Sequence, residues 1–135
     1  MSESPHSTQI RAHTSAAYAL WTLALMWAGV IFWFSARTGS QIPGRFAELG
    51  HLGEYFVFGG LLYAALRSSG GRDSAAAMAL IVASLYGVTD EFHQHFVVMR
   101  TPDVMDWAAD TVGAAAGILA IRTISALRRP WATRP

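Results

Sequence analysis

The stretch AAYALWTLALMWAGVIFWFSA, residues 16–36, decides the fold class of this chain. It contains no charged residue, and it is as long as the roughly 20 apolar residues that a helix needs to cross a bilayer. A secretory signal would instead have a shorter apolar core followed by a small-residue cleavage site. We therefore predict a retained transmembrane helix here, preceded by a polar N-terminal tail over residues 1–15.

The composition of the whole chain points to lipid as its solvent. Of its 135 residues, 53% are hydrophobic and 14% are charged, whereas about a quarter of the residues of a soluble domain are charged. Cysteine is absent, which excludes disulfide bonds and thiolate chemistry. The net charge is +1 and no basic stripe is present, so we expect no nucleic acid as a partner. The expected partner is the lipid bilayer.

Three further apolar runs follow, over residues 50–66, 75–89 and 107–127. They reach spanning length only if the ionisable residues at their ends belong to the helices. The predicted fold is therefore all-α, an integral membrane bundle of about four transmembrane helices over residues 16–127, with a basic tail over 128–135. Thr101 and Pro102 predict the N-cap and the first turn of the fourth helix.

Alternating spans bring the start of the second helix, the end of the third and the start of the fourth to one side of the membrane. Basic residues accumulate on the cytoplasmic side of membrane proteins. One side has Arg11, Arg67, Arg72, Arg122, Arg128, Arg129 and Arg134, and the other has Arg37, Arg45 and Arg100. Both termini are thus predicted to be cytoplasmic, with the polar residues facing outward. Lysine is absent, which indicates a GC-rich bacterial source. Together with the four predicted spans, we expect a multi-pass protein of the bacterial cytoplasmic (inner) membrane.

Polar residues three or four positions apart share a helical face, and several such pairs occur at the converging helix ends. Carboxylates within hydrocarbon are costly unless they are paired, hydrogen-bonded or hydrated. Arg100 is expected to bridge two of the acids, or to hold a phosphate or carboxylate of a ligand. Gly113 and Gly117 predict close helix packing. The predicted ligand-binding residues are His51, Glu54, Glu91, Gln94, Arg100, Asp106 and Asp110.

Two other kinds of site are disfavoured by the spacing of the residues. Metal ligands could come from His51, His93, His95, Glu54 and Glu91. However, no His-Glu-x-x-His or comparable spacing is present, so we expect no metal and no cofactor. The Gly-x-Ser-x-Gly elbow of serine hydrolases is absent as well. The five tryptophans are expected to be lipid-facing or interfacial anchors.

Two motifs of this chain resemble those of the VanZ-like membrane proteins. They are HLGEYFVFG, residues 51–59, and YGVTDEFHQHF, residues 86–96, the second followed by Arg100, Asp106, Asp110, Gly113 and Gly117. By position, the polar signature of the family falls on His51, Glu91, Gln94, Arg100, Asp106 and Asp110. Glu48 departs from the pattern, because many relatives have Lys there. The resemblance, which covers residues 31–117, implies a link to glycopeptide (teicoplanin) resistance and names no reaction.

Three functions remain open from these residues. The favoured one is binding of an anionic, envelope-associated lipid or cell-wall-related ligand, with Arg100 at its head group. The second is an intramembrane acid/base enzyme acting on a lipid-linked substrate, with Glu91 or Asp110 as general base and His51 as proton shuttle. The third is a scaffold whose polar cluster only fixes helix packing. Whether the protein is an enzyme is left open.

Overall fold

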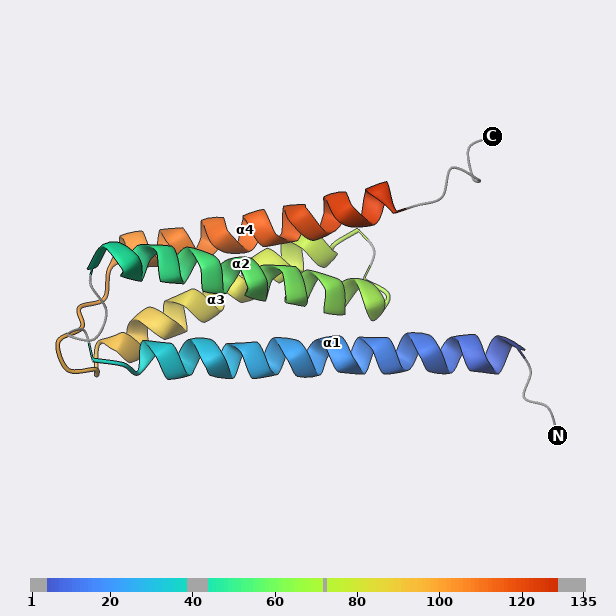
Figure 1. Ribbon diagram of the computed structural model, residues 1–135, viewed down its shortest axis with the longest axis horizontal. Helices are drawn as coiled ribbons and strands as arrows, with labels where there is room; N and C mark the ends of the chain where they lie inside the picture. Colours follow the sequence, from blue (N-terminus) through green and yellow to red (C-terminus); the bar gives the residue numbers. More distant parts are fainter. Residues whose placement is uncertain (1–4, 39–43, 72, 129–135) are drawn as a thin grey trace.

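Four helices make up the described part of the chain, as the computed structural model shows (Figure 1). They are α1 (Pro5–Ser35), α2 (Gly44–Ser68), α3 (Ala75–Gln94) and α4 (Val104–Leu127). The structure describes residues 5–38, 44–71 and 73–128, and the side chains of 14–38, 49–71 and 73–128. No strand occurs within these ranges. The predicted all-α fold of four helices is confirmed, although α1 begins already within the segment predicted as a polar tail.

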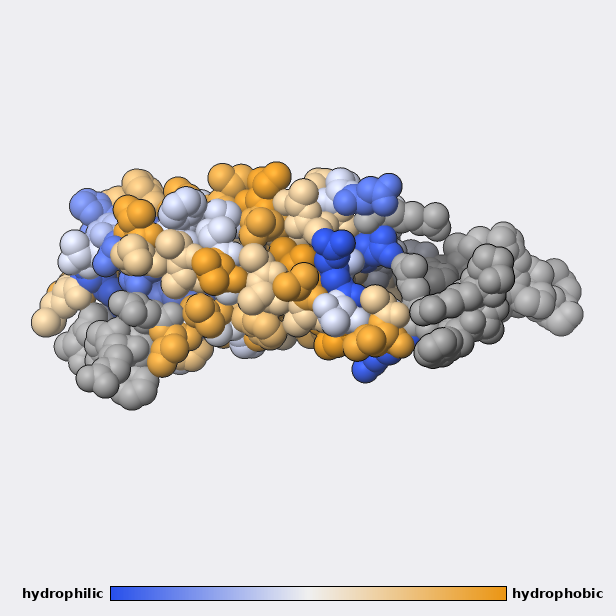
Figure 2. All heavy atoms as spheres, turned by 90° about the horizontal axis from the view of Figure 1, so that it is seen from above, coloured by the Kyte–Doolittle hydropathy of each residue, from blue (hydrophilic) through white to orange (hydrophobic). Residues whose placement is uncertain are grey.

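The helices run alternately up and down, so their ends meet in two groups. The end of α1, the start of α2, the end of α3 and the start of α4 lie together, and we call this the cluster end (Figure 1). The start of α1 and the end of α4 lie at the other end, with the connection between α2 and α3. We call this the far end. Figure 2 shows hydrophobic side chains along the middle of the bundle and hydrophilic side chains toward both ends.

Among the described residues, three helices are long and apolar enough to cross a membrane: Thr14–Ser35, Ala75–Gln94 and Val104–Leu127. The second predicted span, in α2, does not reach this level because it carries His51, Glu54 and Arg67. This helix packs against each of the other three. Its polar residues can therefore face neighbouring helices instead of lipid, which is how membrane proteins tolerate them.

The most extensive helix contact, between α2 and α4, depends on glycine. Gly59, Gly60, Gly113 and Gly117 are all buried, and we call them the glycine seam. A Cβ added at Gly113 would overlap the carbonyl oxygen of Leu52, and one at Gly117 would overlap that of Phe56. The prediction of close helix packing at Gly113 and Gly117 is thus confirmed. The two backbones touch, as in small-residue interfaces between membrane helices.

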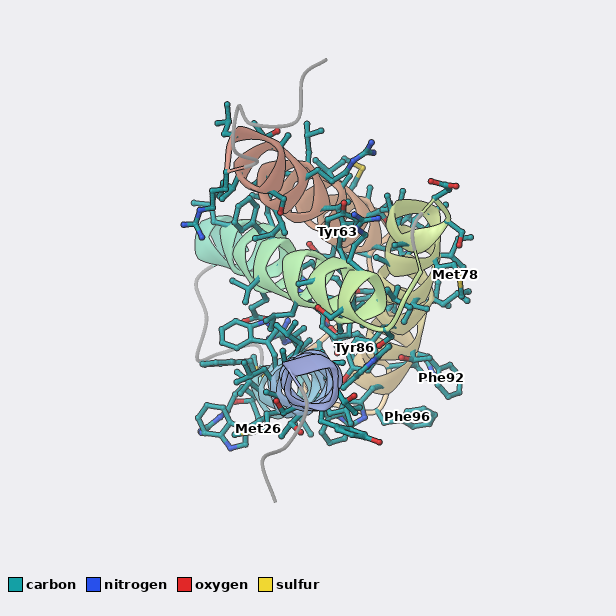
Figure 3. The ribbon with its side chains drawn as sticks, turned by 90° about the vertical axis from the view of Figure 1, so that its right-hand side faces the viewer. Met26, Tyr63, Met78, Tyr86, Phe92 and Phe96 are labelled. Carbon is teal, nitrogen blue, oxygen red and sulfur yellow. The ribbon has the colours of Figure 1, made fainter. Side chains whose placement is uncertain are left out.

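Helix α1 lies against α2 and is also tied to α3 by hydrogen bonds. The Trp27 indole Nε1 donates to the Glu54 carbonyl oxygen at 2.9 Å, and the Tyr86 hydroxyl donates to the Ala28 carbonyl oxygen at 2.8 Å. Figure 3 shows Tyr86 near α1, whereas Phe92 and Phe96 point away from the bundle. Trp107 likewise donates to Ser84 of α3, and Trp21 donates to Ser69, which directly follows α2. The prediction that the tryptophans are simple lipid anchors was therefore incomplete.

The predicted start of α4 was wrong by two residues. The N-cap is Asp103, not Thr101, and its side chain accepts a hydrogen bond from the Met105 amide at 2.8 Å. Aspartate is a better N-cap than threonine, and its negative charge interacts favourably with the helix N-terminus. The Asp103 amide in turn donates to Glu91 Oε2 at 2.8 Å. This second bond fixes the start of α4 against the end of α3.

Candidate functional site

A histidine of α2 and an aspartate of α4 form the centre of the polar residues at the cluster end. His51 Nδ1 lies 3.0 Å from Asp110 Oδ1, and His51 Nε2 lies 4.0 Å from Asp106 Oδ2. The exposed fraction is 7% for His51 and 0% for Asp110. Asp106, one helical turn before Asp110, is nearer the surface. The glycine seam brings the two helices close enough for this contact.

The last turns of α3 add a second group of buried polar side chains. Asp90, Glu91 and Gln94 are all buried. The Gln94 amide nitrogen donates to Asp90 Oδ2 at 3.3 Å, while Glu91 Oε2 accepts the bond from the Asp103 amide. Each acid is thus held by one of its oxygens.

Together, these helices assemble a compact group of His51, Asp90, Glu91 and Asp110, which we call the four-residue cluster. Each residue offers one nitrogen or oxygen atom, and these atoms all lie within 4.8 Å of one another. All four residues are buried. The sequence separates them by up to 59 positions, so only the alternating direction of the helices brings them together.

Several polar atoms around the cluster have no hydrogen-bond partner. They include Glu91 Oε1, Asp110 Oδ2 and the Tyr55 hydroxyl. Tyr55 is fully buried, one helical turn after His51 on the same face of α2. A buried polar group left unpaired costs about 1–3 kcal/mol. Three such atoms in one place indicate a site that is completed by something other than the described residues.

The sequence led us to expect that Arg100 would bridge two of the acids or hold an anionic group of a ligand, and the first alternative is wrong for the described residues. Its Nη1 donates to Gln94 Oε1 at 3.2 Å, and its Nε donates to the Arg37 carbonyl oxygen at 3.3 Å. The Arg37 guanidinium lies 3.8 Å from the centre of the Trp33 ring. Arg100 thus contacts the backbone of Arg37, whose own guanidinium lies on Trp33. We call these two arginines of the cluster end the cationic rim.

A small cavity of about 240 Å³ opens between α3 and α4 beside Glu91. Its other lining residues are Val88, Pro102, Asp103, Val104 and Trp107. The Glu91 carboxyl thus belongs both to the four-residue cluster and to the wall of this cavity. A largely apolar hollow with few polar groups is typical of sites for apolar ligands.

The remaining predicted residues lie at the margin of the site or outside it. Glu54 is half-buried and is not part of the four-residue cluster. Of the histidines considered as metal ligands, His93 stacks on Phe32 and His95 is exposed. The prediction omitted Asp90 and Tyr55. Their spacing from Gln94 and His51, four residues in each case, is the signal that could have identified them.

Comparison with known proteins yields one finding. A family model described as VanZ/LLP1 matches residues 7–125, which is nearly the whole chain. No curated protein and no solved structure matches the chain.

Proposed function

The chain belongs to the VanZ/LLP1 family, and on that premise we propose that it binds an anionic, envelope-associated amphiphile at the cluster end. We also propose that it is a multi-pass protein of the bacterial cytoplasmic membrane with both termini inside. The seven-to-three distribution of arginines supports this orientation. The cluster end then faces outward, where a cell-wall-related ligand would be met. A link to glycopeptide (teicoplanin) resistance belongs to the same proposal.

The observation that carries the proposal is the cationic rim. Within the described residues, Arg100 donates through Nε and Nη1 only, which leaves the donors of Nη2 for a ligand. Its planar guanidinium suits the bidentate recognition of phosphate or carboxylate groups. Arg37 adds a second positive charge at the same end of the bundle, since its backbone contacts Arg100. Two arginines at the same end of a membrane bundle favour an anionic head group over a neutral one.

The cavity between α3 and α4 supports an amphiphile rather than a soluble anion. Apart from Glu91 and Asp103, its lining residues are apolar or proline. Val88 and Trp107 belong to two of the helices that are apolar enough to span a membrane. An acyl or isoprenoid chain could therefore lie against the cavity while the head group binds the cationic rim.

Native mass spectrometry of the gently purified protein tests this function directly. We expect wild-type protein to retain an anionic lipid, and Arg100→Ala to lose it. The matched control is Arg122→Ala, because Arg122 is an exposed arginine of α4 near the far end. Helicity measured by circular dichroism shows that both variants fold.

Two outcomes would contradict the proposal. One is equal retention of the lipid by wild type and Arg100→Ala. The other is wild-type protein that holds no lipid and gains no mass when anionic phospholipid or a lipid-linked cell-wall precursor is added.

A second candidate function, an acid/base enzyme, is favoured by the contact between His51 and Asp110. A carboxylate bonded to one imidazole nitrogen orients the ring for proton transfer through the other. Glu91→Gln would then abolish turnover of lipid-linked substrates in a lipid extract while binding persists, and Glu54→Gln would serve as the control. If Glu91→Gln lowers only the stability in detergent, the residue belongs to a scaffold.

A further inference from the structure

The four-residue cluster has the composition of a metal site. His51 supplies an imidazole nitrogen, and three acids on α3 and α4 supply carboxylate oxygens. The four ligand atoms lie within 4.8 Å of one another. Bonds of about 2.0–2.2 Å from a tetrahedral ion would place its ligand atoms about 3.4 Å apart. The most distant side chains therefore need to close by at most about 1.4 Å to share one ion, which rotation about their side-chain bonds can supply.

Among the described residues, few positive charges balance the cluster. His51 forms an ion pair with Asp110, and in this part of the chain none of the three carboxylates forms an ion pair with an arginine. Arg100 is directed to Gln94 and Arg37 instead. Buried charges without partners are strongly unfavourable, above all within a membrane. A bound cation would supply the missing positive charge.

Unpaired buried atoms provide an independent indication of a ligand. Asp110 is 0% exposed, and its Oδ2 has no hydrogen-bond partner. The Tyr55 side chain is also 0% exposed, and its hydroxyl has no partner either. Tyr55 lies one helical turn after His51, so both side chains are on the same face of α2. Tyr55 lies outside the set of four and could bond to a ligand or to a water molecule on the ion.

The carboxylates are also held as metal ligands usually are. Glu91 Oε2 accepts a bond from the Asp103 amide while its Oε1 has no partner. Asp110 is bonded through Oδ1 to His51 while its Oδ2 has no partner. Bonds of this kind orient the ligands of metal sites, and their loss typically weakens metal binding by 10–100-fold.

From these observations we infer that His51, Asp90, Glu91 and Asp110 bind one divalent transition-metal ion of the Mn²⁺ or Zn²⁺ type. One imidazole together with carboxylates suits these ions better than Mg²⁺, which prefers oxygen ligands and retains its water. The sequence analysis included His51, Glu91 and Asp110 in one polar site, but it predicted no metal because the members of this set lie on three helices and form no linear motif. The inference does not depend on which amphiphile binds the cationic rim.

Metal binding by the full chain in detergent tests the inference. Protein treated with a chelator would be titrated with Mn²⁺, Zn²⁺ and Mg²⁺, and the thermal unfolding midpoint and the bound metal would be measured. We expect about one Mn²⁺ or Zn²⁺ per chain, a midpoint raised by about 5 °C or more, and a much weaker response to Mg²⁺. Glu91→Gln and Asp110→Asn should each weaken binding by about 100-fold or more.

The matched controls are Asp73→Asn and His95→Gln, which change exposed residues and should bind metal as the wild type does. A second measurement uses wild-type protein alone, so it does not depend on how the variants fold. Pulsed electron paramagnetic resonance of bound Mn²⁺ should detect an imidazole nitrogen. The inference is wrong if chelated wild type binds none of these ions, if Glu91→Gln and Asp110→Asn bind as tightly as wild type, or if no nitrogen is detected.

Discussion

The glycine seam and the four-residue cluster lie on the same pair of helices, yet they join them in opposite ways. In the seam, the backbones of α2 and α4 touch because no side chain separates them. In the cluster, only one turn away, His51 meets Asp110 through ionisable groups. Small-residue packing is sufficient to hold membrane helices together, and replacing a buried ion pair by apolar residues is often neutral or stabilising. Adhesion between α2 and α4 therefore needs only the seam, and we infer that the cluster serves the proposed binding site.

The largest effect is expected in the seam. Gly117→Ala would place a Cβ on the backbone of Phe56, so one of the helices must move. We expect a loss of about 3 kcal/mol in the free energy of unfolding, the upper range for overpacking, measured in micelles with increasing denaturing detergent. Gly29→Ala is the control, because its Cβ would meet nothing within 4 Å. Equal stability of the two variants would show that the seam is not the source of adhesion.

The cluster should show strong coupling between its members. In the presence of a chelator, His51→Ala leaves Asp110 buried without its partner, while the double variant with Asp110→Ala removes both groups. We expect the double variant to lose about 2 kcal/mol less than the sum of the two single variants. A double-mutant cycle measures this difference. If the losses in the free energy of unfolding are additive, His51 and Asp110 each contribute to packing independently. The cluster would then not differ from the seam in the way described above.

The smallest effect is expected where α1 attaches to the bundle. Neither the glycine seam nor the four-residue cluster includes α1. Tyr86→Phe removes the hydroxyl that donates to the Ala28 carbonyl oxygen and keeps the ring. The expected loss is about 1 kcal/mol in the free energy of unfolding, the usual net value of one hydrogen bond. Tyr18→Phe should change nothing, because Tyr18 is 70% exposed. A loss above that of Gly117→Ala would instead place the main adhesion of the bundle at α1.

Much of the fold followed from the sequence because the physical rule for it is simple. Apolar runs long enough for a bilayer predicted the helices, and their alternation predicted which ends would meet. The contacts within the site were harder to predict from the sequence. Asp90 and Glu91 are adjacent in sequence, and a helix turns by about 100° between them, yet both are buried. The rotation of α3 about its own axis relative to α2 and α4 determines that both residues are buried. No local sequence pattern predicts this rotation.

The direction of Arg100 could not be predicted for a related reason. Its side chain follows the conformation of the connection between α3 and α4, where Met99 has a positive φ of 61°. Such a backbone angle is uncommon for a residue other than glycine, and nothing in the sequence indicates it. The start of α4 was missed in the same region, since the bond from Asp103 to Glu91 connects two helices.

The close approach of Gly87 to Asp110 limits which residues can replace Asp110 in the course of evolution. A Cβ at Gly87 would lie 3.0 Å from Asp110 Oδ2, so the space around this carboxyl is already limited on the side of α3. The seam prevents α4 from moving away to make room. Exchange of an oxygen for an amino group, as in Asp110→Asn, fits this space, whereas the longer glutamate does not. Substitutions at this position are thus limited to side chains no larger than aspartate, and the exchange of the carboxyl for an amide changes the charge of the site without changing its shape.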